Sequence, residues 1–122
     1  TAMRFAGHLG YHDYESVAID LDERARLVRD LGSHNSMILR NHGLLSAGAD
    51  IAQAFNEMYW LEMACRAQVK ALACNRELVM PSAAVVERTA HLYQPTTRRP
   101  FGVMEWPAML RYLERRDPSF RS

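Results

Sequence analysis

The alternation of apolar and polar positions in the first part of the chain predicts a strand followed by a helix. Residues 8–14, HLGYHDY, place aromatic side chains around a glycine and predict a short strand or strand-loop. Asp20 and Glu23 have the spacing of a capping box that opens a helix, and Gly32 is the residue expected to end it. The apolar face of this helix is formed by Leu21, Ala25, Leu27, Val28 and Leu31.

The next apolar segment predicts a buried strand that runs directly into a histidine. MILRNHGLLSAG predicts strands over Met37–Asn41 and Leu44–Ala47, with His42 and Gly43 between them. The order strand, helix, strand is typical of an α/β or α+β layered sheet. Open α/β sheets place their chemistry at strand ends, so the residues around His42 are candidates for a functional site.

Helices are predicted for most of the remaining chain. The longest spans Asp50–Cys74, with Asp50 as its cap and Gln53 reaching back toward the helix start. A third helix is predicted with Ser82 as its cap, and a last one covers EWPAMLRYLERRDP with Pro107 near its first turn. Four large side chains of the longest helix are interpreted as core packing: Phe55, Met58, Tyr59 and Trp60.

The composition is that of a soluble globular protein, and it argues against nucleic-acid and membrane partners. Of the 122 residues, 48% are hydrophobic and 24% are charged, with a formal net charge of +1. No apolar run approaches the roughly 20 residues that span a bilayer. Cys65 and Cys74 lie about 13.5 Å apart along one predicted helix, too far for a disulfide. We therefore expect reduced thiols in a cytoplasmic protein.

His42 is the first candidate for chemistry. Gly43 allows the backbone to leave the strand at an angle, and Asn41 can hold the turn by side-chain hydrogen bonds. An imidazole fixed in such a frame suits a divalent metal, although a histidine that simply occupies a turn is the more frequent case. A catalytic zinc site needs three protein ligands, and the sequence contains no HxH and no HExxH segment. The other histidines are not spaced as an obvious set: His8, His12, His34 and His91.

Residues 11–15, YHDYE, form a dense polar and aromatic cluster. Such a segment suits a surface loop whose rings pack on the sheet edge. Alternatively, a tyrosine hydroxyl in this segment serves as a proton donor beside a site. The residues alone leave both interpretations open.

The chain resembles the class II aldolase/adducin domain in four segments: YHDYE, LGSHNSMILRNHGLLSAG, AFNEMYWLEMACRAQ and EWPAMLRYLERRDPSFR. The resemblance covers almost all 122 residues and falls on the bacterial branch that is similar to adducin. It implies an α/β protein with a three-layer α/β/α fold and a mixed, largely antiparallel central sheet. It also implies that residues 1–122 are the C-terminal part of a single domain that is truncated at its N-terminus.

The resemblance further implies roles for two residues. Active members of the family use a divalent metal, usually zinc, with iron or manganese as other choices. They cleave or form a C–C bond next to a carbonyl of a small hydroxy-carbonyl or sugar-phosphate substrate. By this resemblance His42 is a metal ligand, with two further ligands in an upstream HxH segment. Tyr11 is the matching proton donor, acting in the site of a neighbouring subunit. Ser16 stands where the family commonly has glycine.

The resemblance leads to expectations about assembly and activity. We expect a homo-oligomer, since the family builds its site between subunits and is often tetrameric. We expect the parent to be a metal-dependent aldolase-type lyase and the 122-residue chain alone to be inactive, because it lacks the HxH ligands and the catalytic carboxylate. Two other functions remain open on this fold. One is a non-catalytic, adducin-like oligomerisation module, and the other is an iron-dependent oxygenase.

Overall fold

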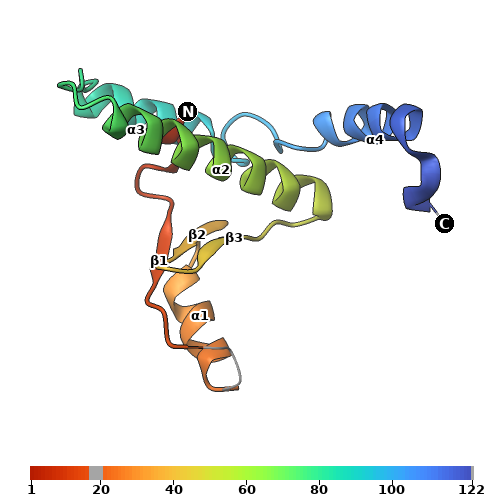
Figure 1. The fold of residues 1–122 in the computed structure, drawn as a ribbon, viewed down its shortest axis with the longest axis horizontal. Coiled ribbons are helices and arrows are strands. Elements are labelled where there is room, and N and C mark those ends of the chain that lie inside the picture. Colours follow the sequence, from red (N-terminus) through yellow and green to blue (C-terminus); the bar gives the residue numbers. More distant parts are fainter. Residues whose placement is uncertain (17–20, 122) are drawn as a thin grey trace.

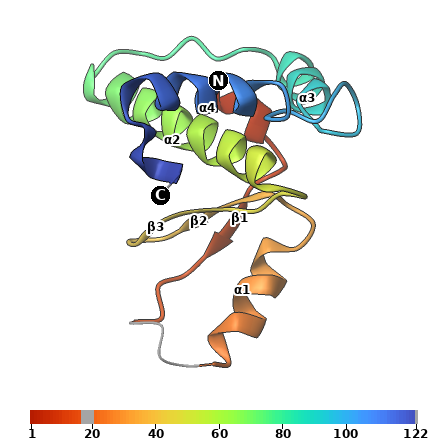
Figure 2. The same cartoon turned by 90° about the vertical axis from the view of Figure 1, so that its right-hand side faces the viewer.

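The computed structural model describes residues 1–16 and 21–121, whose helices lie on both sides of a small sheet (Figure 1). Figure 2 shows α1 on one side of the strands and α2, α3 and α4 on the other. The predicted three-layer α/β/α arrangement is therefore confirmed. The elements follow in the order η1 (Ala2–Phe5), β1 (Gly10–His12), α1 (Glu23–Leu31), β2 (Ser36–Leu39), β3 (Gly43–Ser46), α2 (Ile51–Ala73), α3 (Ala83–Leu92), α4 (Glu105–Arg116) and η2 (Pro118–Arg121).

The sheet is mixed, as predicted, with its strands in the order β1-β2-β3. β1 pairs with β2 in parallel, and Tyr11 lies opposite Ile38. β2 pairs with β3 antiparallel, and Ile38 lies opposite Leu44. The parallel pairing needs a crossover, and α1 supplies it on one side of the sheet.

A tight turn joins β2 to β3 and presents His42. β2 ends at Leu39 and β3 already begins at Gly43, so both predicted strands are confirmed but lie slightly earlier in the sequence. The His42 N–H donates to the Leu39 carbonyl at 3.0 Å. The left-handed backbone conformation falls on Asn41, with a φ of 58°, rather than on Gly43. Asparagine tolerates this conformation better than most residues, which explains its place in the turn.

The helix α1 begins later than the sequence predicts. Asp22 occupies its N-cap position and Glu23 is its first helical residue, whereas a capping box from Asp20 requires Glu23 at the third position. Asp20 itself lies outside the described residues. The predicted stop at Gly32 is confirmed, with a φ of 56° and its N–H donating to the Val28 carbonyl at 3.0 Å.

The helix α2 begins at the predicted cap. The Asp50 carboxylate accepts a hydrogen bond from the Gln53 N–H at 2.7 Å. The Gln53 side chain reaches back one residue further than expected and accepts from the Ala49 N–H, also at 2.7 Å. Ser82 occupies the predicted N-cap position of α3, but its side chain makes no capping hydrogen bond there. Pro107 lies in the first turn of α4, as predicted. In the part of the chain that the structure describes, no helix is long and apolar enough to cross a membrane.

The prediction that the apolar stripe of α2 forms the core is wrong for its aromatic residues. Phe55, Tyr59 and Trp60 are 41%, 48% and 36% exposed in the chain. The side of α2 that faces the sheet buries Leu61 and Ala64 together with three polar residues, Gln53, Asn56 and Glu57. On this inner face Arg4 of η1 and Ser36 of β2 both hydrogen-bond to the Glu57 carboxylate.

Candidate functional site

A cavity of about 230 Å³ lies where the ends of β1 and β2 meet the first turns of α1. Its lining includes His12, Tyr14, Glu23, Leu27, Leu39 and His42. The cavity thus joins the histidine that the sequence singled out with a second histidine and with Tyr14 of the YHDYE cluster. An apolar floor with a few converging polar groups is the usual character of a small-molecule site.

His42 lies exposed on the turn at the edge of this cavity. Its ring stacks on that of Tyr14, with 5.9 Å between the ring centroids and an interplanar angle of 20°. This stack limits the rotation of the imidazole and leaves it accessible. The role of His42 as a metal ligand stays a prediction, because among the described residues it belongs to no group of three potential ligands.

His12 is the buried centre of the site, and sequence reasoning missed it. The residue is 4% exposed. Its Nδ1 lies 2.8 Å from Oδ2 of Asp30, while its Nε2 lies 3.8 Å from a Glu23 oxygen and 3.9 Å from a Glu15 oxygen. Those two longer contacts are not hydrogen bonds, so within the described ranges Nε2 is a buried ring nitrogen without a hydrogen-bond partner.

The carboxylate of Asp30 orients the His12 ring. The hydrogen bond from His12 lowers the pKa of Asp30 below its ordinary value, and the Arg29 guanidinium lowers it further. An ionised Asp30 fixes the hydrogen on Nδ1 and leaves the lone pair of Nε2 for another partner. A sequence signal for this arrangement exists, because Glu23 and Asp30 are seven residues apart and therefore lie on one face of α1.

Tyr11 points away from this cavity, since neighbouring strand residues face opposite sides of a sheet. It is 49% exposed and lines a separate depression with Ile38, Leu61 and Cys65. The Arg40 guanidinium lies over its ring at 5.2 Å. Within one chain the structure therefore brings Tyr14, and not Tyr11, to His42. The proposed action of Tyr11 in a neighbouring subunit is not tested by this geometry.

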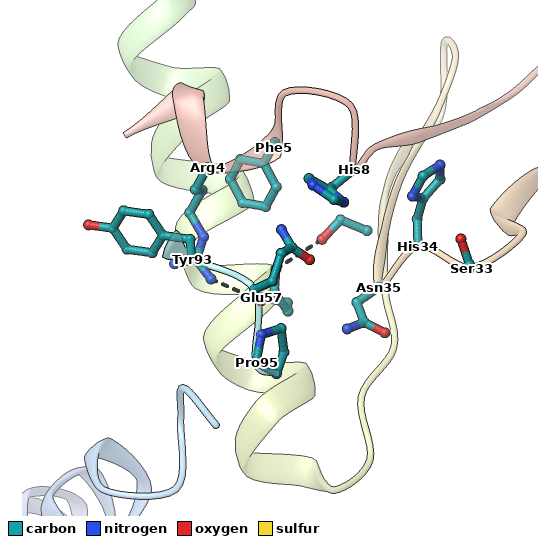
Figure 3. Close-up of a pocket in the computed structure, with 11 residues that line it drawn as sticks. Arg4, Phe5, His8, Ser33, His34, Asn35, Glu57, Tyr93 and Pro95 are labelled. Carbon is teal, nitrogen blue, oxygen red and sulfur yellow. Dashed lines mark hydrogen bonds and ion pairs between the residues drawn. The ribbon is translucent and has the colours of Figure 1, made fainter. Parts of the chain in front are cut away.

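A second pocket, shown in Figure 3, contributes to the packing of the fold and is not a substrate site. Its centre is an ion pair between Arg4 and Glu57 at 2.9 Å, and the Ser36 hydroxyl donates to the same carboxylate at 3.2 Å. Only about 30 Å³ of space remains, enough for about one water molecule. The pocket joins η1, β2 and α2 around a buried charge pair and leaves no room for a substrate.

Comparisons of the sequence with known proteins identify one family and several relatives. The family model described as "Class II Aldolase and Adducin N-terminal domain" matches residues 1–69. A Caulobacter vibrioides protein named "Putative aldolase class 2 protein" is 42% identical over 92% of the chain, and alpha-adducin of Rattus norvegicus is 40% identical over 55% of it.

A solved structure is similar over nearly the whole chain. The crystal structure of an aldolase II superfamily protein from Pseudomonas syringae superposes with a TM-score of 0.88 over 99% of the chain, at 39% identity. The chain covers 49% of that structure, 44% of the Caulobacter protein and 9% of the rat adducin. It therefore spans less than half the length of these relatives.

Proposed function

The chain belongs to the class II aldolase and adducin family, and on that premise we propose that its full-length gene product is a metal-dependent lyase. The substrate class is a small hydroxy-carbonyl compound or sugar phosphate, cleaved at the C–C bond next to the carbonyl carbon. The similarity to a protein named as a class 2 aldolase supports the proposal. The observation that carries it is the accessible imidazole of His42, held by the stacked Tyr14 ring beside a cavity.

His42 suits the metal as one ligand of several. Its ring is exposed at the cavity edge, and a neutral imidazole nitrogen is a good ligand for zinc. The further ligands and the carboxylate base are proposed to lie in an HxH-bearing segment outside these 122 residues. When bound, the metal supplies Lewis-acid stabilisation of the negative charge that develops on the substrate oxygens.

The chain's own residues contribute positioning and proton transfer. Tyr14 holds the His42 ring, and the side chains of Leu27 and Leu39 form an apolar part of the cavity lining. Tyr11 donates a proton in the site of a neighbouring subunit, which agrees with its exposed position on the opposite side of β1. Because His42 and Tyr11 of one site come from different subunits, the active form is a homo-oligomer.

The activity test compares the full-length gene product with its His42→Ala variant. Both proteins, supplied with zinc, are incubated with a panel of sugar phosphates and hydroxy-keto acids, and the released carbonyl product is measured. We expect turnover of at least one compound and a loss of at least a hundredfold in the variant. His91→Ala, at an exposed histidine on α3, is the matched control and should retain full activity. Equal turnover by His42→Ala and the wild type would refute the proposal.

The role of Tyr11 has a separate test. Tyr11→Phe and His42→Ala should each be inactive alone, while a mixed oligomer of the two contains sites with an intact histidine from one subunit and an intact tyrosine from another. Unfolding and reassembling the mixture should therefore restore part of the activity. A mixture as inactive as its components, with mixed oligomers demonstrated by mass spectrometry, would remove Tyr11 from the site.

An adducin-like module without catalysis is the second candidate. The match to alpha-adducin favours it, and so does the exposed aromatic face of α2. Exposed apolar surface of this kind marks protein–protein interfaces. Phe55 and Trp106 pack edge to face at 5.2 Å between α2 and α4 and extend the same surface. Oligomers that form without metal and turn over no member of the panel would support this second function instead of the first.

A further inference from the structure

We propose that His12, Glu15 and Glu23 form a binding site for a divalent transition-metal ion, separate from the ligand His42. The ligand atoms of these three residues lie within 4.8 Å of one another, and His42 is not part of the group. The site joins the end of β1 to the first turn of α1. The inference does not rest on the proposed lyase activity, because it uses only side chains that the structure places together.

The buried nitrogen of His12 is the observation that points to a ligand. Nε2 lies among two carboxylates without a hydrogen-bond partner in the described residues, and a buried polar atom left unpaired costs free energy. Ligand atoms around a tetrahedral ion with bonds of about 2.1 Å are about 3.4 Å apart. The contacts of 3.8 Å to Glu23 and 3.9 Å to Glu15 therefore need to shorten by only about half an ångström.

The outer contacts are those expected around metal ligands. His12 presents Nδ1 to Asp30, the carboxylate–histidine arrangement that fixes the tautomer of a ligating imidazole. Arg26 donates to both oxygens of Glu15, at 3.0, 2.8 and 2.6 Å. A carboxylate has about four acceptor positions, so Oε1 of Glu15 retains a lone pair for an ion. Charged side chains thus orient two of the three ligands, since Asp30 holds His12 and Arg26 holds Glu15.

The charge of the cluster favours a cation. Glu15, Glu23 and Asp30 contribute three negative charges, and Arg26 and Arg29 contribute two positive ones. With a neutral imidazole the net charge is negative, and a divalent ion offsets it. One nitrogen and two carboxylate oxygens suit zinc or manganese better than calcium, which prefers six to eight oxygen ligands. His12 and Glu23 line the same cavity that His42 borders, and this cavity leaves room for water at the remaining positions of the ion.

The experiment is zinc binding to the full-length gene product, measured by competition with a chromogenic chelator after removal of all metal. In His42→Ala, which lacks the proposed lyase ligand, we expect one equivalent of zinc to remain bound. Adding Glu23→Gln to this background should weaken that binding at least tenfold, and adding Asp30→Asn should weaken it between ten- and a hundredfold through the orientation of His12. Glu62→Gln, at an exposed carboxylate on α2, is the matched control and should change nothing.

The outcomes separate this site from its alternatives. Circular dichroism of the metal-free variants shows whether each one is folded, and Glu15→Gln replaces any Glu23 variant that is not. No zinc bound in the His42→Ala background would overturn the proposal. Zinc binding that is unchanged by both glutamine substitutions would also overturn it. Because the readout is zinc and not turnover, failure of the proposed lyase function leaves the result interpretable.

Discussion

Breaking the buried ion pair between Arg4 and Glu57 should be among the most destabilising single changes in this chain. The two side chains are 4% and 10% exposed, with 2.9 Å between NH2 of Arg4 and Oε1 of Glu57. Removing one partner of a buried pair leaves the other charge without compensation, at a cost of about 3–5 kcal/mol. The Arg4 guanidinium also lies 5.2 Å from the ring centres of Phe5 and Tyr93, and these cation–π contacts persist in a Glu57 variant. We therefore expect Glu57→Gln to lower the free energy of unfolding by about 2–4 kcal/mol.

A double-mutant cycle tests the origin of this effect. Arg4→Met and Glu57→Met should each be strongly destabilising, whereas the double variant replaces the pair with apolar side chains and should lie within about 2 kcal/mol of the wild type. Urea denaturation followed by tryptophan fluorescence is the assay, since Trp60 lies beside the Arg4 guanidinium. The exposed pair Glu62–Arg66 on α2 is the matched control, and its Glu62→Gln variant should cost less than about 0.5 kcal/mol. Single variants that cost under 1 kcal/mol, or costs that simply add, would refute the reasoning.

Three further predictions concern local structure. Gly102→Ala should lower the free energy of unfolding in urea by about 3 kcal/mol or more. The φ of Gly102 is 100°, and a Cβ there would lie 2.2 Å from the Ala52 carbonyl oxygen. A near-neutral result would show that the backbone at Gly102 moves away from α2 at little cost. Asp50→Ala should cost about 1 kcal/mol by loss of the α2 cap, and an unchanged midpoint would contradict that role. The pKa of Glu105 is lowered from 4.5 chiefly by its hydrogen bond from Arg99, so the wild type should exceed Glu105→Gln in stability above about pH 5 and lose that advantage as the pH falls through the lowered pKa. The advantage should stay below about 1 kcal/mol because the pair is partly exposed, and urea titrations at pH 3 and pH 6 that show no such difference would contradict it.

The elements that the sequence predicts correctly are those specified by neighbouring residues. Asp50 and Gln53 mark the start of α2 because capping is a contact over three or four residues. The hairpin is equally local, because Asn41 can adopt the left-handed conformation that its turn needs. The polar inner face of α2 was not predictable in this way. Glu57 is buried because it pairs with Arg4, which is 53 residues away in the sequence. The spacing of residues within the helix gives no indication of such a distant partner.

The candidate site was predictable only in part, for the same reason. His42 is recognisable because a strand, a turn and a histidine follow one another in the sequence. His12 becomes significant only when the pairing of β1 directs it inward and α1 brings Glu23 and Asp30 to it. The face that a strand residue occupies depends on register, and the register of a parallel pair is fixed by distant residues. Tyr11 and His12 are adjacent in sequence, yet they face opposite sides of the sheet.

The central claim, that His42 is a metal ligand of a lyase, is tested most directly by the metal content of the full-length gene product. The wild type, His42→Ala and the control His91→Ala are purified in parallel, dialysed against a weak chelator and analysed by mass spectrometry for zinc, iron and manganese. We expect His42→Ala to lose one equivalent of metal per chain relative to the wild type, and His91→Ala to lose none. Equal metal content in all three proteins would contradict the claim.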